Sequence, residues 1–340
     1  MSKQRIQLSD HFTYSRLLRF VLPCIGTMLF TSIYGIVDGL CVSNFVGKTA
    51  FAAVNLIMPL PMLLGTIGFM LGTGGSAIVG ITLGEGDQKK ADRYFTLFLL
   101  AALVSVSVLA VLGIVFLRPI AVLLGAKGEL LDYAVRYGRI LMVSLPTFAL
   151  QNMFQSFFVT AEKPLLGFWF TVGAGCTNMV LDVLMVGIWG WGVEGAAIAT
   201  FISQLVGGVL PVFYFIDRSN SSRLHLCKTS FYSKVLRDAC INGSSELMTN
   251  LSMSLVNILY NFQLLRLAGE NGVAAYGVIM YAAFLFVAVF VGYAVGSAPI
   301  VSFHYGARNQ AEVHNLYQKS LRLIAVVAVT LTLASMFIIP

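Results

Sequence analysis

Long runs without a charged side chain alternate with short polar segments along the whole chain. The runs that lack Asp, Glu, Lys and Arg are residues 20–37, 49–84, 94–117, 140–161, 164–181, 195–216, 247–265, 271–307 and 323–340. A helix that crosses a bilayer needs about 20 apolar residues, whereas the strands of an outer-membrane barrel are shorter and alternate in polarity. The pattern therefore predicts an all-α integral membrane protein with nine transmembrane helices.

The composition agrees with this interpretation. Of the 340 residues, 58% are hydrophobic and only 11% are charged. A soluble domain carries about 25% charged residues, and a soluble fold of this length could not bury so much apolar surface. We therefore expect the lipid bilayer to be the first partner of the chain.

The basic residues are distributed unevenly between the predicted loops. The chain has 22 Lys and Arg residues and a formal net charge of +7. With a cytoplasmic amino terminus, 16 of them fall on the inside and 6 on the outside, which is the bias that sets membrane orientation. We predict a multi-pass protein of the bacterial plasma membrane with its amino terminus in the cytoplasm, and no binding of nucleic acid.

An internal repeat divides the chain. GKTAFAAVNLIM (47–58) is similar to GENGVAAYGVIM (269–280), an offset of 222 residues (269 − 47), and 11 of the 45 positions from 47 to 91 are identical at this offset. This indicates a duplicated unit. The predicted domains are an amino-terminal six-helix lobe (1–216), a cytoplasmic linker (217–230) and the first three helices of a carboxy-terminal lobe (231–340).

The repeat also predicts a longer parent architecture. At the same offset Pro340 corresponds to Arg118, at the end of the third span of the first unit. The second repeat is then incomplete, with nine of twelve expected helices present. A natural short product and a fragment are both compatible with this pattern, and so is a chain that is inactive without the last three helices.

Acidic residues within the apolar runs are the main functional signal. Asp38 ends the apolar run of the first predicted helix, and Asp182 interrupts the fifth predicted helix. Glu246 lies early in the seventh predicted helix. A charge at the bilayer centre costs roughly 2.5–3.5 kcal/mol, so intramembrane acids are functional candidates. No Lys or Arg lies within these runs to neutralise them.

Polar residues recur at helical spacing around the acids, and lipid cannot satisfy such stripes. The candidates for the coupling cation are Asp38, Asn178, Asp182 and Thr200; those for substrate or a proton are Tyr34, Gln151, Gln155, Glu246, Asn250 and Asn257. Hydrogen bonding between helices is the alternative role for such residues. Burial disfavours a charged carboxylate, which suits proton exchange, while carboxylate, amide and hydroxyl oxygens equally suit a hard cation. The first four residues are therefore also a possible Na⁺ site, and we expect no cofactor besides the coupling ion, H⁺ or Na⁺.

Several segments resemble the multidrug and toxic compound extrusion (MATE) family. They are SIYGIVDGLCVSNFVG (32–47), MLGTGGSAIVGITLGEGDQKKA (70–91), TNMVLDVLMV (177–186) with GVEGAAIATFISQ (192–204), and APIVSFHYGARNQAEV (298–313). The resemblance implies two six-helix lobes that open alternately to each side, and export of cationic amphiphiles in exchange for H⁺ or Na⁺. It also implies that Asp38, Asn178, Asp182 and Thr200 form the cation site of the amino-terminal lobe, and it links Glu246 more weakly to a second-lobe acid.

The predicted function is thus secondary antiport of cationic amphiphilic drugs, by a chain that we expect to be monomeric. A lipid-linked oligosaccharide flippase of the same superfamily is one alternative, but its anionic substrate would call for basic residues within the spans. A membrane enzyme is disfavoured because the four histidines are scattered. Phe154 and Phe157 are expected to line a drug cavity.

Overall fold

The computed structural model describes residues 6–45 and 48–338; for parts of α1, α2, α9 and α10 it describes the backbone alone. Every element in these ranges is a helix, as predicted. The helices are α1 (Tyr14–Phe45), α2 (Lys48–Ile57), α3 (Pro59–Gly84), α4 (Gln88–Leu123), α5 (Glu129–Thr160), α6 (Pro164–Asp182), the π-helix η1 (Val183–Ile188), α7 (Gly192–Gly208), α8 (Leu210–Ile216), α9 (Ser233–Gly306) and α10 (Gln310–Ile338).

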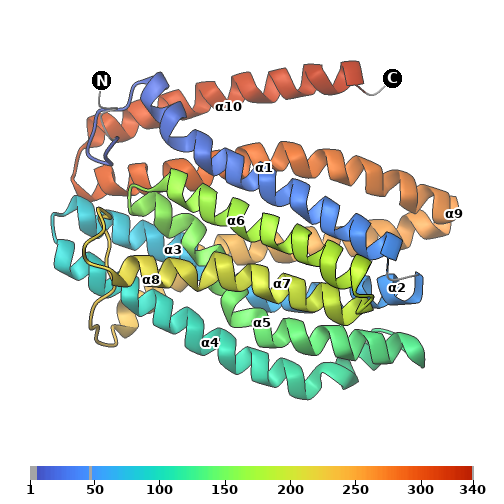
Figure 1. Cartoon of the computed structure of the whole chain (residues 1–340). Coiled ribbons are helices and arrows are strands. Elements are labelled where there is room, and N and C mark those ends of the chain that lie inside the picture. The colour runs from blue at the N-terminus through green and yellow to red at the C-terminus, as the bar shows by residue number, and fades with distance from the viewer. Residues whose placement is uncertain (1–5, 46–47, 339–340) are drawn as a thin grey trace.

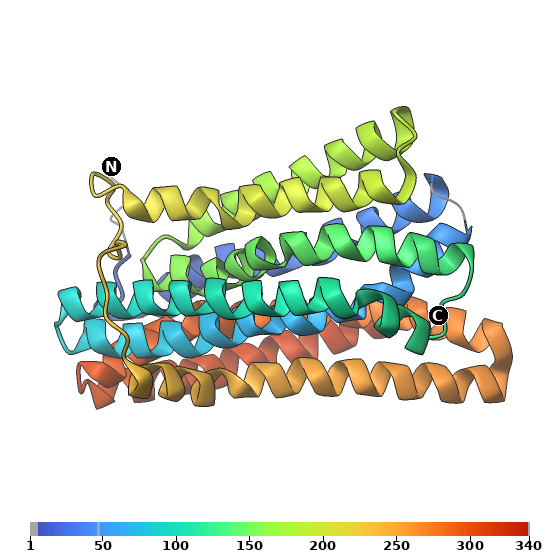
Figure 2. The ribbon, with the colours of Figure 1, turned by 90° about the horizontal axis from the view of Figure 1, so that it is seen from below.

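The long helices lie side by side along one direction (Figure 1). The turns that join α3 to α4 and α5 to α6 lie at the same end of the bundle as the amino terminus, together with the non-helical residues 217–232 (Figures 1 and 2). We call this the N-terminal end. The α3–α4 turn follows from its sequence, because Gly86 adopts a positive φ of 87° and the Asp87 side chain caps α4 by accepting from the N–H of Lys90.

Helix α9 accounts for two of the predicted spans. It contains 74 residues, which a straight helix would extend to about 110 Å. Yet Gly74 of α3 lies against Ala239, and Gly84, about 15 Å further along the same helix, lies against Phe303. Both ends of α9 therefore pack on one short stretch of α3, so α9 doubles back, as Figure 2 shows.

Seven helical segments among the described residues are long and apolar enough to cross a membrane. Helix α5 is not one of them, although its residues 140–160 carry no charge. Its amide side chains, including Gln151 and Gln155, lower its mean hydropathy. Polar residues that lie within the bundle thus lower the mean hydropathy of a predicted transmembrane span.

Close contacts between α3 and α9 repeat the sequence offset of 222. Gly84 lies against the carbonyl oxygen of Phe303, and Gly306 lies against the carbonyl oxygen of Ile81. Gly84 and Gly306 are 222 positions apart, and so are Ile81 and Phe303. The same contact is therefore made twice with the partners exchanged, which is the arrangement that two copies of one unit make around a two-fold axis.

A second pair of contacts shows the same relation. A Cβ atom at Gly74 would lie 2.7 Å from the backbone nitrogen of Gly243, and one at Gly296 would lie 2.8 Å from Cγ1 of Val21. Gly74 with Gly296, and Val21 with Gly243, are again 222 positions apart. These contacts fit a duplicated unit; the boundaries of the two lobes themselves stay a prediction.

The segment before α1 joins distant elements at the N-terminal end. The N–H of Leu8 donates to Oε1 of Glu162 (2.9 Å), and the N–H of Phe12 donates to Oε1 of Glu312 (2.9 Å). Leu8 and Phe12 are fully buried. Glu162 also accepts from the guanidinium of Arg223 (2.6 Å). This end of the bundle is therefore closed by glycine contacts, buried apolar side chains and carboxylates that have partners.

Candidate cation and substrate cavity

Helices α1, α3, α5, α6, α7 and α9 enclose a cavity of about 440 Å³. Its lining contains a set of the polar residues that the sequence singled out: Tyr34, Gln151, Gln155, Asn178, Thr200 and Asn250. They come from five helices and span more than 200 positions of the chain. The helical polar stripes thus meet at one place, because each had to face away from lipid.

Small residues allow α5 to bring its amides to the cavity. A Cβ atom at Gly207 of α7 would lie 2.7 Å from Cδ of Gln151, and one at Gly208 would meet the carbonyl oxygen of Thr147. The absence of side chains at these two positions lets α7 approach α5 closely. Gln151 therefore lies against the backbone of α7 rather than being displaced by it.

Four buried amide atoms around the cavity have no hydrogen-bond partner within the described part of the chain. They are Nδ2 of Asn152, Oε1 of Gln155, Nδ2 of Asn178 and Oε1 of Gln204. A buried polar group that stays unpaired costs about 1–3 kcal/mol, and such groups normally mark a place for water or a ligand. The cavity wall consequently carries amide groups that have no hydrogen-bond partner among the described residues.

Asp182 lies one helical turn beyond Asn178 at the end of α6. The two side chains are 1% and 2% exposed. Asp182 directly precedes the π-helix η1, and π-helical turns occur frequently at functional sites because the extra residue shifts the helix register. The buried carboxylate therefore lies at a change in helical geometry, immediately next to an amide of the cavity wall.

Thr200 contributes a hydroxyl from α7. Its Oγ1 donates to the carbonyl oxygen of Ala196 (3.0 Å), one turn earlier in the same helix. That bond engages the hydroxyl proton and leaves the oxygen lone pairs able to accept a hydrogen bond or to coordinate a cation. Thr200 is thus suited to the ligand role expected of it.

Of the remaining candidates, Glu246 is described and is not among the residues that line the cavity. Asp38 lies in α1 and Asn257 in α9, but both side chains fall outside what the structure describes. Glu246 is half-buried in α9, and its carbonyl oxygen accepts from Nδ2 of Asn250 (2.8 Å). Within the described residues no group of three or more His, Cys, Asp or Glu side chains could hold a metal ion. The Na⁺ site of Asp38, Asn178, Asp182 and Thr200 stays a prediction.

The expectation for Phe154 and Phe157 is wrong. Both are buried in an aromatic cluster, where Phe154 stacks on Phe215 with ring centroids 5.6 Å apart and Phe157 packs on Phe95 at 4.8 Å. The α5 aromatic residue that lines the cavity is Phe148. The reason is spacing, because Phe148 lies three and seven positions before the cavity residues Gln151 and Gln155, on the same face of the helix.

Other cavity residues carried no signal in the sequence. Met58, Met62 and Phe69 supply apolar surface from the α2–α3 region. Apolar side chains in a transmembrane helix are equally compatible with lipid, helix packing and a cavity. The cavity wall is therefore mixed, with amides and hydroxyls beside flexible and aromatic apolar groups.

Comparisons with known proteins agree with this architecture. The family model described as MatE matches residues 23–184 and 247–340. The chain is 21% identical over 314 residues to the multidrug export protein MepA of Staphylococcus saprophyticus, covering 92% of this chain and 69% of the relative. It is 22% identical over 323 residues to MepA of Staphylococcus aureus, covering 94% and 71%.

Solved structures show the same fold. One is described as the outward-facing conformation of a multidrug resistance MATE family transporter, with a TM-score of 0.91, 22% identity and coverage of 99% of this chain and 75% of that one. A crystal structure of MATE in the straight conformation gives a TM-score of 0.87 at 23% identity, with coverage of 97% and 74%. The predicted helical transporter fold is thereby confirmed.

Proposed function

The chain belongs to the MatE family, whose members are membrane transporters and not enzymes, and from that premise we propose that it exports cationic amphiphilic compounds. One observation carries the proposal: four buried amide atoms without a partner among the described residues line a single cavity, whose other walls are hydroxyl-bearing, apolar and aromatic. A ligand with an apolar body and a few polar atoms fits such a wall. The name of the MepA relatives, multidrug export protein, supports the same substrate class.

The size and charge of the cavity support a cationic or neutral drug-sized substrate. Its volume of about 440 Å³ falls within the range of small-molecule sites. The described lining includes no Lys or Arg, so an anionic pyrophosphate would find no counter-charge. Tyr34, Phe69 and Phe148 offer aromatic faces, which attract cations. This argues against the oligosaccharide flippase.

We propose that Asp182 couples transport to H⁺ or Na⁺, with Asn178, Thr200 and Asp38 as its partners. A neutralised carboxylate and a charged one interact differently with a cationic guest in the neighbouring cavity. Ion binding then shifts the balance between the two access states through its differential affinity for them. The substrate leaves when the ion arrives, and the emptied site becomes available again.

The proposed setting is the bacterial plasma membrane, with the N-terminal end in the cytoplasm and the chain acting as a monomer. The basic excess predicted for the inside loops supports this orientation, since Lys and Arg are retained on the cytoplasmic side. In this orientation, the glycine contacts and the Glu162 hydrogen bonds close the path towards the cytoplasm.

Ethidium uptake into inverted vesicles, with H⁺ and Na⁺ gradients imposed separately, tests the proposal. We expect one of the two gradients to drive ethidium movement by the full chain, and Asp182→Asn to abolish that movement at equal protein level. Glu194→Gln is the matched control, since Glu194 is an exposed acid whose salt bridge to Arg136 lies outside the cavity. Gradient-driven uptake that persists in Asp182→Asn would exclude the coupling role.

A further inference from the structure

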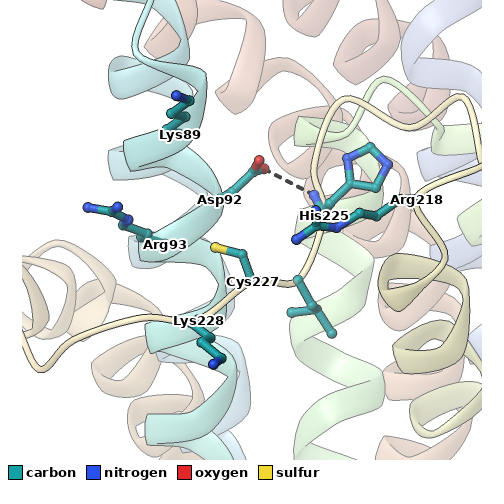
Figure 3. A pocket seen from close by; sticks show the side chains of 8 residues that line it. Lys89, Asp92, Arg93, Arg218, His225, Cys227 and Lys228 are labelled. Atoms are coloured by element: carbon teal, nitrogen blue, oxygen red, sulfur yellow. Dashed lines mark hydrogen bonds between the residues drawn. The ribbon is translucent and has the colours of Figure 1, made fainter.

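A second cavity, of about 480 Å³, lies at the N-terminal end between α4 and the linker that follows α8. Four basic side chains lie around it: Lys89 and Arg93 from α4, and Arg218 and Lys228 from the linker (Figure 3). The transport cycle proposed above gives these residues no task. They are far apart in sequence, so the fold itself assembles the cluster.

The linker is fixed in place by backbone and side-chain hydrogen bonds to α4. Oδ1 of Asp92 accepts from the N–H of His225 (3.0 Å; Figure 3), and Oγ1 of Thr96 accepts from the N–H of Cys227 (3.1 Å). The hydroxyl of Thr229 donates to the carbonyl oxygen of Arg93 (2.8 Å). The rim of this cavity is therefore an ordered arrangement and not a chance approach of two flexible segments.

The acid in the cluster is already engaged. Asp92 also accepts from Nε2 of Gln88 (3.2 Å), in addition to the N–H of His225. Among the described residues, none of the four basic side chains forms a salt bridge or donates a hydrogen bond. Four positive charges thus lie around this cavity with one carboxylate, that of Asp92, in its described lining. An anion would relieve their mutual repulsion.

The apolar surface of α4 that continues from the basic residues indicates which kind of anion binds. At 3.6 residues per turn, Lys89 and Arg93 share a face of α4 with Leu100, Val104 and Val111. Those three apolar side chains are 45%, 63% and 62% exposed, as expected for a surface that contacts acyl chains. Leu100 lies only about 10 Å along the helix from Arg93. A molecule that places a phosphate among the basic groups can therefore lay a hydrocarbon chain along the same face.

An exposed aromatic residue supports a position of this cavity at the level of the lipid headgroups. Phe231 follows Lys228 closely in the linker and is 75% exposed. Apolar residues such as Phe, close to Lys and Arg, are typical of segments that lie at the boundary between headgroups and acyl chains. Basic pockets on the cytoplasmic side of membrane helices accept anionic lipid headgroups. The exposed ring and the charged cavity are thus arranged for the interface.

We propose that the cavity formed by Lys89, Arg93, Arg218 and Lys228 binds a phosphate-bearing anion, the headgroup of an anionic phospholipid of the cytoplasmic leaflet. The inference rests on the membrane orientation proposed above and not on the drug or the coupling ion. Because the linker joins the two predicted lobes, lipid bound here holds it against α4. The lipid is thereby a structural partner at the hinge between the repeats.

Native mass spectrometry of the purified full chain tests this site without any transport assay. Phosphatidylglycerol, phosphatidylcholine and inorganic phosphate are titrated separately, and bound species are counted. We expect phosphatidylglycerol to bind in preference to phosphatidylcholine, and the double variant Arg93→Gln, Arg218→Gln to bind it about 30-fold more weakly, because each basic residue near an anionic headgroup contributes about fivefold. The pair Lys89→Gln, Lys228→Gln is expected to give a similar loss and serves if the first variant fails to fold.

Arg118→Gln with Arg139→Gln is the matched control. It removes the same number of exposed Arg charges at the opposite end of the bundle, and Arg118 shares the face of α4 with Arg93. Binding within about twofold of the unmodified chain is expected. Equal losses in the test and control variants, or no loss in either, would overturn the proposal. Displacement of phosphatidylglycerol by millimolar inorganic phosphate would also overturn it, since the site would then be one for free phosphate.

Discussion

The N-terminal end and the central cavity bury polar groups in opposite ways. At the N-terminal end, Glu162 accepts from both Leu8 and Arg223, and glycines let backbones touch. In the cavity, Oε1 of Gln155 and Nδ2 of Asn178 are buried without a partner among the described residues. The first arrangement stabilises one packing of the helices, whereas the second leaves polar groups available to form hydrogen bonds with a bound substrate. A transporter needs both arrangements, because it must keep one side closed while a substrate is bound.

The largest effect is expected at the glycine contacts. Gly84→Ala places a methyl group against the carbonyl oxygen of Phe303, and backbone on both sides cannot yield cheaply. We expect a loss of about 3 kcal/mol in the free energy of unfolding, measured as a fall in the thermal unfolding midpoint in detergent. Gly173→Ala is the control, since the nearest atom to its added Cβ would be 3.9 Å away. A midpoint for Gly84→Ala equal to that of the control would show that the contact does not close this end.

A smaller effect of opposite sign is expected in the cavity. Gln155→Met replaces an amide whose Oε1 has no partner among the described residues with an apolar group of similar shape. We therefore expect a gain of about 1 kcal/mol in the free energy of unfolding. Ethidium binding should weaken about fivefold, because the guest loses a hydrogen bond of similar strength. Both quantities are read by thermal unfolding and by dye fluorescence anisotropy.

The same substitution at the N-terminal end sharpens the comparison. Gln88 donates from Nε2 to Asp92 and to the carbonyl oxygen of Arg223, so Gln88→Met should lower stability and leave ethidium binding unchanged. Destabilisation by both substitutions, with no change in dye binding, would mean that the cavity amides serve helix packing.

Many of the cavity residues could be predicted from the sequence, because polar side chains are unfavourable in contact with lipid. Gln151, Gln155, Asn178 and Thr200 had to face the protein interior, and the structure brings all four to one cavity. Aromatic residues carry no such constraint, which is why Phe154 and Phe157 were placed wrongly. Only their spacing relative to the amides separates them from Phe148, which does line the cavity.

Contacts that depend on the arrangement of whole helices could not be predicted. The sequence predicts a basic excess on one side of the membrane, but the approach of Arg93 to Arg218 depends on how residues 217–232 lie across α4. The repeat offset was visible in the sequence, whereas the exchanged contacts of Gly84 and Gly306 required the packing of α3 on α9.

Equilibrium binding of ethidium to the purified chain, followed by fluorescence anisotropy across pH and Na⁺ concentration, tests the central claim most directly. Competition between ion and drug through Asp182 predicts that binding by the unmodified chain weakens as either H⁺ or Na⁺ rises. Asp182→Asn, which mimics a neutralised carboxyl group, should bind at that weak level under all conditions. An Asp182→Asn variant that keeps the full ion dependence, or an unmodified chain that shows none, would contradict the account.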